Sequence, residues 1–223
     1  VGVTREEADS FAAISHSRTE NSVDNGIWAD EIVDVETHDG ILSTSEEDHF
    51  VRGTSNESLA ALRTHFGPTS LVTAGNASGV VDGAAAVVLK SASQAADDGD
   101  KPLARIVNWG IVGLEPAIMA YGPVPASKLA LERAGLRIED IDLWEINEAF
   151  ASVPLHYMRE LDIDHEITNV NGGAIAMGHP LGATGGCLVS TVLDELERRA
   201  LHRAMISLCV GGGMGISTII ERC

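Results

Sequence analysis

The sequence predicts an α/β fold in which helices pack on both faces of a buried sheet. Segments with helical periodicity alternate with short, continuous apolar runs over residues 84–220, and these runs include 84–89 and 204–210. Such runs are typical of strands that are buried on both faces, and their alternation with helices is typical of layered α/β folds. Hydrophobic residues make up 44% of the 223 residues, which is enough for a substantial core.

The N-terminal third follows a different pattern. Residues 4–7 (Thr-Arg-Glu-Glu) match a capping box, which predicts an amphipathic helix over about 5–25. A short alternating strand is expected over 32–35, and the polar, irregular stretch 37–56 is expected to form a surface loop. A further helix is expected over 57–66.

The rest of the chain repeats the alternation of strand and helix. Strands are expected at 84–89, 104–114, 141–144, 204–210 and 215–220. Helices are expected to end at 98–99 and to cover about 125–134, 149–161 and 183–200.

Charge and hydropathy exclude several classes of partner. The formal net charge is −18, from 33 acidic residues against 15 lysines and arginines, so the surface repels nucleic acid and anionic membranes. No apolar run is long enough to span a bilayer, and the N-terminus does not resemble a signal peptide. We therefore expect a cytoplasmic protein that binds neither nucleic acid nor membrane.

The three cysteines do not form a C-x-x-C pair, which argues against a disulfide framework and against a zinc site. We expect no bound metal. Cys187 lies within a predicted helix and Cys223 is the last residue, and we expect both to be structural. Cys209 lies at the end of an apolar strand, where a cysteine can be a small buried hydrophobe or a reactive thiol.

Three motifs in the C-terminal half combine polar or nucleophilic side chains with glycine and other small residues. They are Asn-Glu-Ala-Phe at 147–150, Gly-His-Pro-Leu-Gly-Ala-Thr-Gly at 178–185 and Cys-Val-Gly-Gly-Gly-Met-Gly at 209–215. Small residues let the backbone approach a ligand closely and direct N–H groups at it. Such an arrangement is suited to carbonyl chemistry.

These motifs, together with residues 73–79 and 122–127, resemble those of the thiolase family, and the resemblance covers essentially the whole chain. It implies the layered αβαβα thiolase fold, of which the chain would hold the C-terminal half plus the loop domain. The implied parts are a CoA-covering loop domain at 1–79, a returning strand and helix of the N-terminal half at 80–102, and the C-terminal domain at 103–223. The family's acyl-accepting cysteine belongs to a segment upstream of these residues, so we expect a longer enzyme.

The resemblance also assigns catalytic roles. His179 would deprotonate the acyl-accepting cysteine and then hydrogen-bond a thioester oxygen of the substrate. Asn147 would fix a water in an oxyanion hole, although at a strand-to-helix junction it could also be an N-cap. Cys209 would remove or return the α-proton of acetyl-CoA, and the N–H of Gly211 would contribute to a second oxyanion hole.

Three further residues resemble the family's CoA-binding positions. Ser78 would hydrogen-bond the pantetheine arm, Phe150 would line the tunnel for that arm, and Arg52 would lie near the nucleotide end. The alternatives are a turn serine for Ser78 and a core aromatic for Phe150. The acidic stretch 46–48 beside Arg52 is unfavourable for binding the phosphates of CoA.

The function implied is that of an acyl-CoA acyltransferase. It would cleave a 3-ketoacyl-CoA with CoA, as in fatty acid metabolism, or run the reverse Claisen condensation of acetyl-CoA. Coenzyme A is then a substrate, no other cofactor is expected, and the complete protein is expected to be a homodimer or homotetramer. The alternatives are a non-catalytic CoA-binding remnant and a partner subunit of a split thiolase.

Overall fold

The structure, a computed structural model, describes residues 2–29, 31–38, 40–42 and 51–223. It divides into two compact units, and each is assembled from segments that are separate in the sequence. The first unit comprises Val1–Asp82, Glu148–Leu155 and Asn169–His179. The second unit comprises Gly83–Asn147, His156–Thr168 and Pro180–Cys223.

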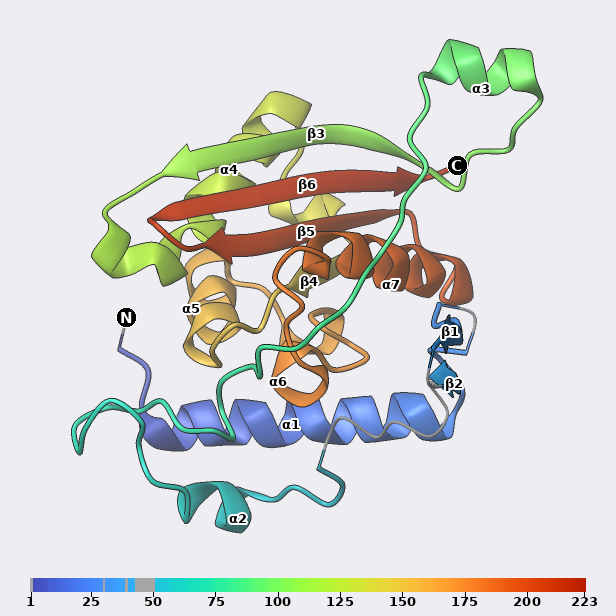
Figure 1. Ribbon diagram of the computed structural model, residues 1–223. Helices are drawn as coiled ribbons and strands as arrows, with labels where there is room; N and C mark the ends of the chain where they lie inside the picture. The colour runs from blue at the N-terminus through green and yellow to red at the C-terminus, as the bar shows by residue number, and fades with distance from the viewer. Residues whose placement is uncertain (1, 30, 39, 43–50) are drawn as a thin grey trace. The chain divides into compact units, whose positions relative to one another are not determined.

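The first unit is built on helix α1 (Arg5–Asp24), which Figure 1 draws in blue. The predicted capping box is confirmed, because the N–H of Glu7 donates to Thr4 Oγ1 (3.2 Å) and the N–H of Thr4 donates to the Glu7 carboxylate (2.7 Å). The buried face of α1 is unusually polar. Besides Ala8, Phe11 and Ala12 it carries Asp9, Ser15, His16, Thr19 and Ser22.

The other elements of the first unit are short. Strands β1 (Val35–Thr37) and β2 (Gly40–Leu42) pair antiparallel, and helices α2 (Asn56–Ala60) and α6 (Ala174–Met177) each contact α1.

Two sequence-based boundaries in the first unit were wrong. The strand expected at 32–35 begins only at Val35, and the helix expected over 57–66 ends at Ala60. Beyond that point the N–H of His65 donates to the carbonyl of Val72 (2.8 Å), which is a loop contact that a continuing helix would not allow. The loop expected over 37–56 includes β2, and its residues 43–50 lie outside the described residues.

The second unit contains a mixed sheet with the strand order β3-β6-β5-β4. The strands are β3 (Ala104–Gly113), β4 (Leu143–Ile146), β5 (Arg203–Val210) and β6 (Met214–Arg222). The pairs β3–β6 and β6–β5 are antiparallel, whereas β5 and β4 run parallel. Figure 1 shows β5 and β6 as the red hairpin of this sheet.

Helices α4 (Pro123–Ala134) and α7 (Thr184–Arg198) pack on this sheet. In Figure 1 α7 lies in front of the sheet and α4 lies behind it, as the layered prediction requires. Gly110 of β3 allows α4 to approach closely, since a Cβ there would overlap the carbonyl oxygen of Ala126. No helix within the described ranges is long and apolar enough to cross a membrane.

The remaining helices complete the described chain. They are α3 (Ala92–Asp98), α5 (Ser152–Leu161) and three short 3₁₀ segments at Pro116–Tyr121, Ile138–Asp140 and His165–Ile167. Helix α3 ends as predicted, at Gly99, which adopts the left-handed conformation.

The strand expected at 84–89 does not form. Its side chains are largely exposed, with Val88 at 85% and Leu89 at 72%. A strand requires hydrogen-bonded neighbours, and no other segment within the described residues pairs with this one. Strand β4 begins two residues later than predicted. Helix α5 begins three residues later than predicted, because backbone groups of 149–151 bond instead to residues 76–78.

Four hydroxyl groups form a buried cluster in the second unit. Ser127 Oγ of α4 lies 2.5 Å from the phenol oxygen of Tyr157, 2.9 Å from Ser207 Oγ and 2.8 Å from Ser217 Oγ. Ser207 of β5 and Ser217 of β6 also hydrogen-bond each other. Burial raises the pKa of Tyr157, so its phenol remains protonated at neutral pH. The cluster therefore joins α4 and α5 to the centre of the sheet.

We predict that Ser127→Ala lowers the free energy of unfolding by about 1–3 kcal/mol, because it leaves buried hydroxyls without a central partner. The exposed Ser93→Ala is the matched control and should change stability by less than about 0.5 kcal/mol. Denaturant titration measures both. Equal stabilities of the two variants would contradict this role of the cluster.

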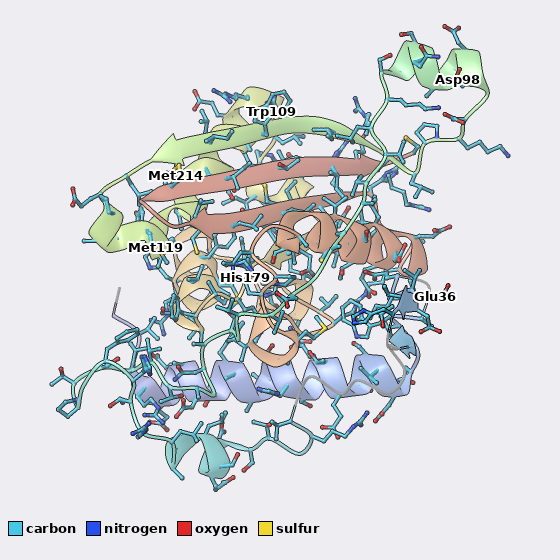
Figure 2. All side chains as sticks on the ribbon, in the orientation of Figure 1. Glu36, Asp98, Trp109, Met119, His179 and Met214 are labelled. Atoms are coloured by element: carbon cyan, nitrogen blue, oxygen red, sulfur yellow. The ribbon has the colours of Figure 1, made fainter. Side chains whose placement is uncertain are left out.

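We also predict that the 223-residue chain expressed alone binds a hydrophobic dye more strongly than a well-packed globular protein of similar size, which serves as the control. Exposed apolar side chains cluster in sequence at Val80, Val87, Val88 and Leu89, and Trp109 on β3 is 52% exposed (Figure 2). Dye fluorescence and light scattering measure the difference. A dye-free, cooperatively melting monomer would overturn the prediction.

Candidate active site

The second unit brings Asn147 and Cys209 to the same edge of its sheet. Ile146 of β4 pairs with Ser207 of β5 in parallel register, and the N–H of Asn147 extends the ladder by donating to the carbonyl of Ser207 (2.9 Å). Asn147 thus follows β4, while Cys209 lies two residues beyond Ser207. Both side chains are buried, at 1% and 8% exposure. Carboxyl ends of neighbouring parallel strands are where α/β folds place their ligands.

The glycine run after Cys209 forms the turn between β5 and β6. Gly212 and Gly213 have φ values of 92° and 89°, and a Cβ at Gly213 would overlap the carbonyl of Leu114. The turn itself therefore requires these two glycines. Gly211 is different, because a Cβ there would meet nothing within 4 Å among the described residues and its φ is not left-handed. The hairpin therefore does not explain glycine at position 211.

Burial raises the pKa of the Cys209 thiol. The group is therefore a protonated thiol at neutral pH. A protonated thiol can donate a proton, and it becomes a base only after giving that proton up. This state suits an acid/base residue better than a permanently ionised nucleophile.

The first unit brings Ser78, Phe150 and His179 together along one short segment. Residue 77 pairs with Phe150 in an antiparallel bridge, and the N–H and hydroxyl of Ser78 both donate to the carbonyl of Ala149 (3.1 and 3.2 Å). The N–H of His179 donates to the carbonyl of Gly79 (2.8 Å). Segment 77–79 therefore connects the Asn-Glu-Ala-Phe and Gly-His-Pro motifs through its backbone.

His179, labelled in Figure 2, follows Gly178, whose φ of 90° is left-handed. A Cβ at Gly178 would lie 2.6 Å from Val81 Cγ1, so both conformation and space favour glycine. The half-buried setting lowers the pKa of the His179 imidazole. The ring is then neutral at pH 7 and can accept a proton.

Arg52 is already paired with acidic side chains of α1. Its Nη1 lies 2.9 Å from Asp24 Oδ1 and 3.6 Å from Glu20 Oε1, and all three groups are at least partly exposed. The acidic residues 46–48, which precede Arg52 in the sequence, lie outside the described residues. The proposed contact of Arg52 with CoA thus remains a prediction, and it would compete with these ion pairs.

Sequence reasoning missed Glu148. This carboxyl group is 1% exposed and accepts hydrogen bonds from Ser15, Asn169 and the backbone of Ile175. The available signals were an acidic residue two positions after a buried strand and the unexplained Asn-Gly-Gly at 171–173. Cys187 is half-buried on α7 and Cys223 is exposed.

Two family models together match most of the chain. The family model "Thiolase, N-terminal domain" matches residues 1–93, and "Thiolase, C-terminal domain" matches residues 100–222. The acetyl-CoA acetyltransferase of Rhizobium meliloti is 46% identical over 222 residues, which cover 99% of this chain and 56% of that protein.

Solved structures are similar over the same extent. The Bacillus anthracis acetyl-CoA acetyltransferase matches with a TM-score of 0.94 and 42% identity, covering 99% of this chain and 57% of that one. Human mitochondrial 3-ketoacyl-CoA thiolase in complex with CoA matches with a TM-score of 0.89 and 40% identity, covering 99% and 55%. The chain thus spans little more than half the length of these relatives. With both family models matched and this degree of identity, the chain belongs to the thiolase family.

Proposed function

We propose that the full-length protein containing this chain is an acyl-CoA acyltransferase that cleaves 3-ketoacyl-CoA with CoA and runs the reverse condensation of acetyl-CoA. The observation that carries the proposal is the alignment of Asn147 and Cys209 at the ends of parallel neighbours β4 and β5. Relatives named acetyl-CoA acetyltransferase and 3-ketoacyl-CoA thiolase support it.

In the cleavage direction, an acyl-accepting cysteine attacks the 3-keto carbon, and His179 accepts the proton of that thiol. The bond between C2 and C3 then breaks, and its electron pair passes to C2 as the enolate of acetyl-CoA. A water held by Asn147 donates to the enolate oxygen, and Cys209 supplies the proton that C2 takes up. CoA then binds as a thiol and gives its proton to the Cys209 thiolate, and its sulfur attacks the bound acyl carbon. The bond from that carbon to the acyl-accepting cysteine breaks, and the departing thiolate takes its proton back from His179.

Each residue has a physical reason for its role. The neutral imidazole of His179 suits a base, and the protonated thiol of Cys209 suits a proton donor. The N–H of Gly211 would donate to the developing thioester oxyanion. Ser78 and Phe150 would contact the pantetheine arm of CoA, and Arg52 would interact with its nucleotide end.

Several wider features belong to the same proposal. CoA and acyl-CoA are the substrates, fatty acid metabolism is the setting, and the complete protein forms a homodimer or homotetramer in the cytoplasm. Retention of Asn147, His179 and Cys209 favours a catalytic protein over a CoA-binding remnant.

We predict that Cys209→Ala in the full-length protein abolishes thiolysis of a 3-ketoacyl-CoA and condensation of acetyl-CoA alike, because the same proton moves in both directions. Steady-state assays in each direction measure this. Cys223→Ala removes an exposed thiol and is the matched control, with activity expected to equal that of the parent. Substantial turnover by Cys209→Ala would exclude this role.

Asn147→Ala is predicted to lower kcat by about 10²–10³-fold, because it releases the water that donates to the enolate oxygen and loss of one oxyanion-hole donor usually costs this much. Because the donor acts mainly in the transition state, KM should change much less. Initial-rate kinetics over a range of substrate concentrations separate the two parameters. A loss confined to KM would instead indicate that Asn147 only binds substrate.

The raised pKa of Cys209 predicts slow alkylation at neutral pH, since only the thiolate reacts. Iodoacetamide at pH 7.5 should modify the exposed Cys223 well before Cys209, and the rate at Cys209 should keep rising above pH 9. Peptide mass spectrometry of the full-length protein gives both rates, and the denatured protein serves as the control. Faster modification of Cys209 than of Cys223 at pH 7.5 would mean that its pKa is lowered.

A further inference from the structure

Among the described residues, Glu148 is the most buried carboxyl group, and the reaction above has no use for it. It follows Asn147 in the chain, and 1% of its surface is exposed. Its carboxylate accepts hydrogen bonds from Ser15 Oγ (2.6 Å), Asn169 Nδ2 (2.9 Å) and the N–H of Ile175 (3.2 Å). The three donors belong to α1, to the loop before α6 and to the first turn of α6.

The glycine pair at 172–173 is explained by close contacts with Glu148 and with α1. A Cβ at Gly173 would lie 2.5 Å from the carboxyl carbon of Glu148, and a Cβ at Gly172 would overlap Thr19 Oγ1 and approach Ser15 of α1. Any larger residue would push the loop away from the carboxylate or from the helix. Glu148 and the two glycines thus form one close-packed contact.

Ile175, whose N–H donates to Glu148, lies four residues before His179 in the chain. The carboxylate holds the amide of Ile175 in α6, and α6 closes at Gly178, whose N–H donates to the carbonyl of Ala174 (2.8 Å). His179 follows at once, and its own N–H bonds to Gly79 (2.8 Å). The backbone that presents the imidazole is therefore fixed at its start by Glu148 and at its end by Gly79.

A buried carboxyl group is a costly way to gain stability alone. Burial raises the pKa of Glu148, and the bonds from Ser15, Asn169 and Ile175 together with the charge of Arg18 oppose that rise. Replacing such a group by an apolar residue is often neutral for stability, whereas a fully bonded polar group defines one geometry. The three bonds thus favour a geometric role for Glu148.

We propose that Glu148 is a positioning residue for His179, acting through the first turn of α6. Its effect on catalysis rests on the proposed thiolase function, but its hold on the backbone of His179 does not. Glu148→Gln is the most informative variant, because glutamine has nearly the same shape as glutamate. Its side-chain NH₂ replaces one carboxylate oxygen and so faces a donor in place of an acceptor. Ser15→Ala removes only one donor and should give a smaller effect of the same kind.

The first measurement is amide hydrogen exchange of the full-length protein. Glu148→Gln should speed exchange at residues 175–179 by about tenfold or more, since those amides lose their anchored turn. Glu145→Gln removes another buried carboxyl group, on β4, and should leave this segment unchanged. Equal exchange in Glu148→Gln and the parent, or an equal increase in Glu145→Gln, would overturn the proposal.

The second measurement is a double-mutant cycle on kcat. Glu148→Gln should lower kcat by about 10–100-fold with little change in KM, as expected for a misplaced catalytic group. In the His179→Ala background the same substitution should cost less than about threefold, because the group it positions is gone. Equal losses in both backgrounds would show a general structural effect and contradict the proposal.

The two measurements separate the possible failures. A parent protein without thiolase activity would refute the proposed function. Faster exchange at 175–179 in Glu148→Gln would still establish the hold of Glu148 on the backbone of His179.

Discussion

The parallel pairing of β4 with β5 is the constraint on which the candidate chemistry depends. Register fixes Ile146 opposite Ser207, and the bond from the N–H of Asn147 to Ser207 carries that register one residue past the strand. A slip by one residue would turn Cys209 to the opposite face of the sheet. The hydroxyl cluster around Ser127 acts on the same strands, because Ser207 and Ser217 are two of its members. Ser207 therefore belongs both to the buried hydroxyl cluster and to the strand pairing that places Asn147 and Cys209 at one edge of the sheet.

In the first unit, several loops with little regular structure are held against helix α1. Helix α1 does this with polar contacts. Asn76 Nδ2 donates to Asp9 (2.9 Å), Ser15 donates to Glu148, and Ser22 Oγ donates to the carbonyl of Asn171 (3.3 Å). Directional bonds of this kind fix the backbone of a loop more closely than apolar contacts would. The polar face of α1 is therefore explained by the loops it holds.

The elements that were predicted correctly from the sequence were those that depend on local signals. The capping box at Thr4, the helix end at Gly99 and the strand that ends at Val210 were all predictable, because each depends on a few adjacent residues. The apolar run 84–89 failed because strand formation depends on a neighbour that composition does not reveal. Glu148 was missed for the same reason, since its donors Asn169, Ile175 and Ser15 lie 21, 27 and 133 residues away in the sequence.

The central claim is that Cys209 moves a proton at the α-carbon of acetyl-CoA. The most direct test is to incubate the full-length protein with acetyl-CoA in D₂O and to follow the methyl group by NMR. The account predicts that the parent and Cys223→Ala incorporate deuterium and that Cys209→Ala does not. Incorporation by Cys209→Ala at the parental rate, or none by the parent, would contradict it.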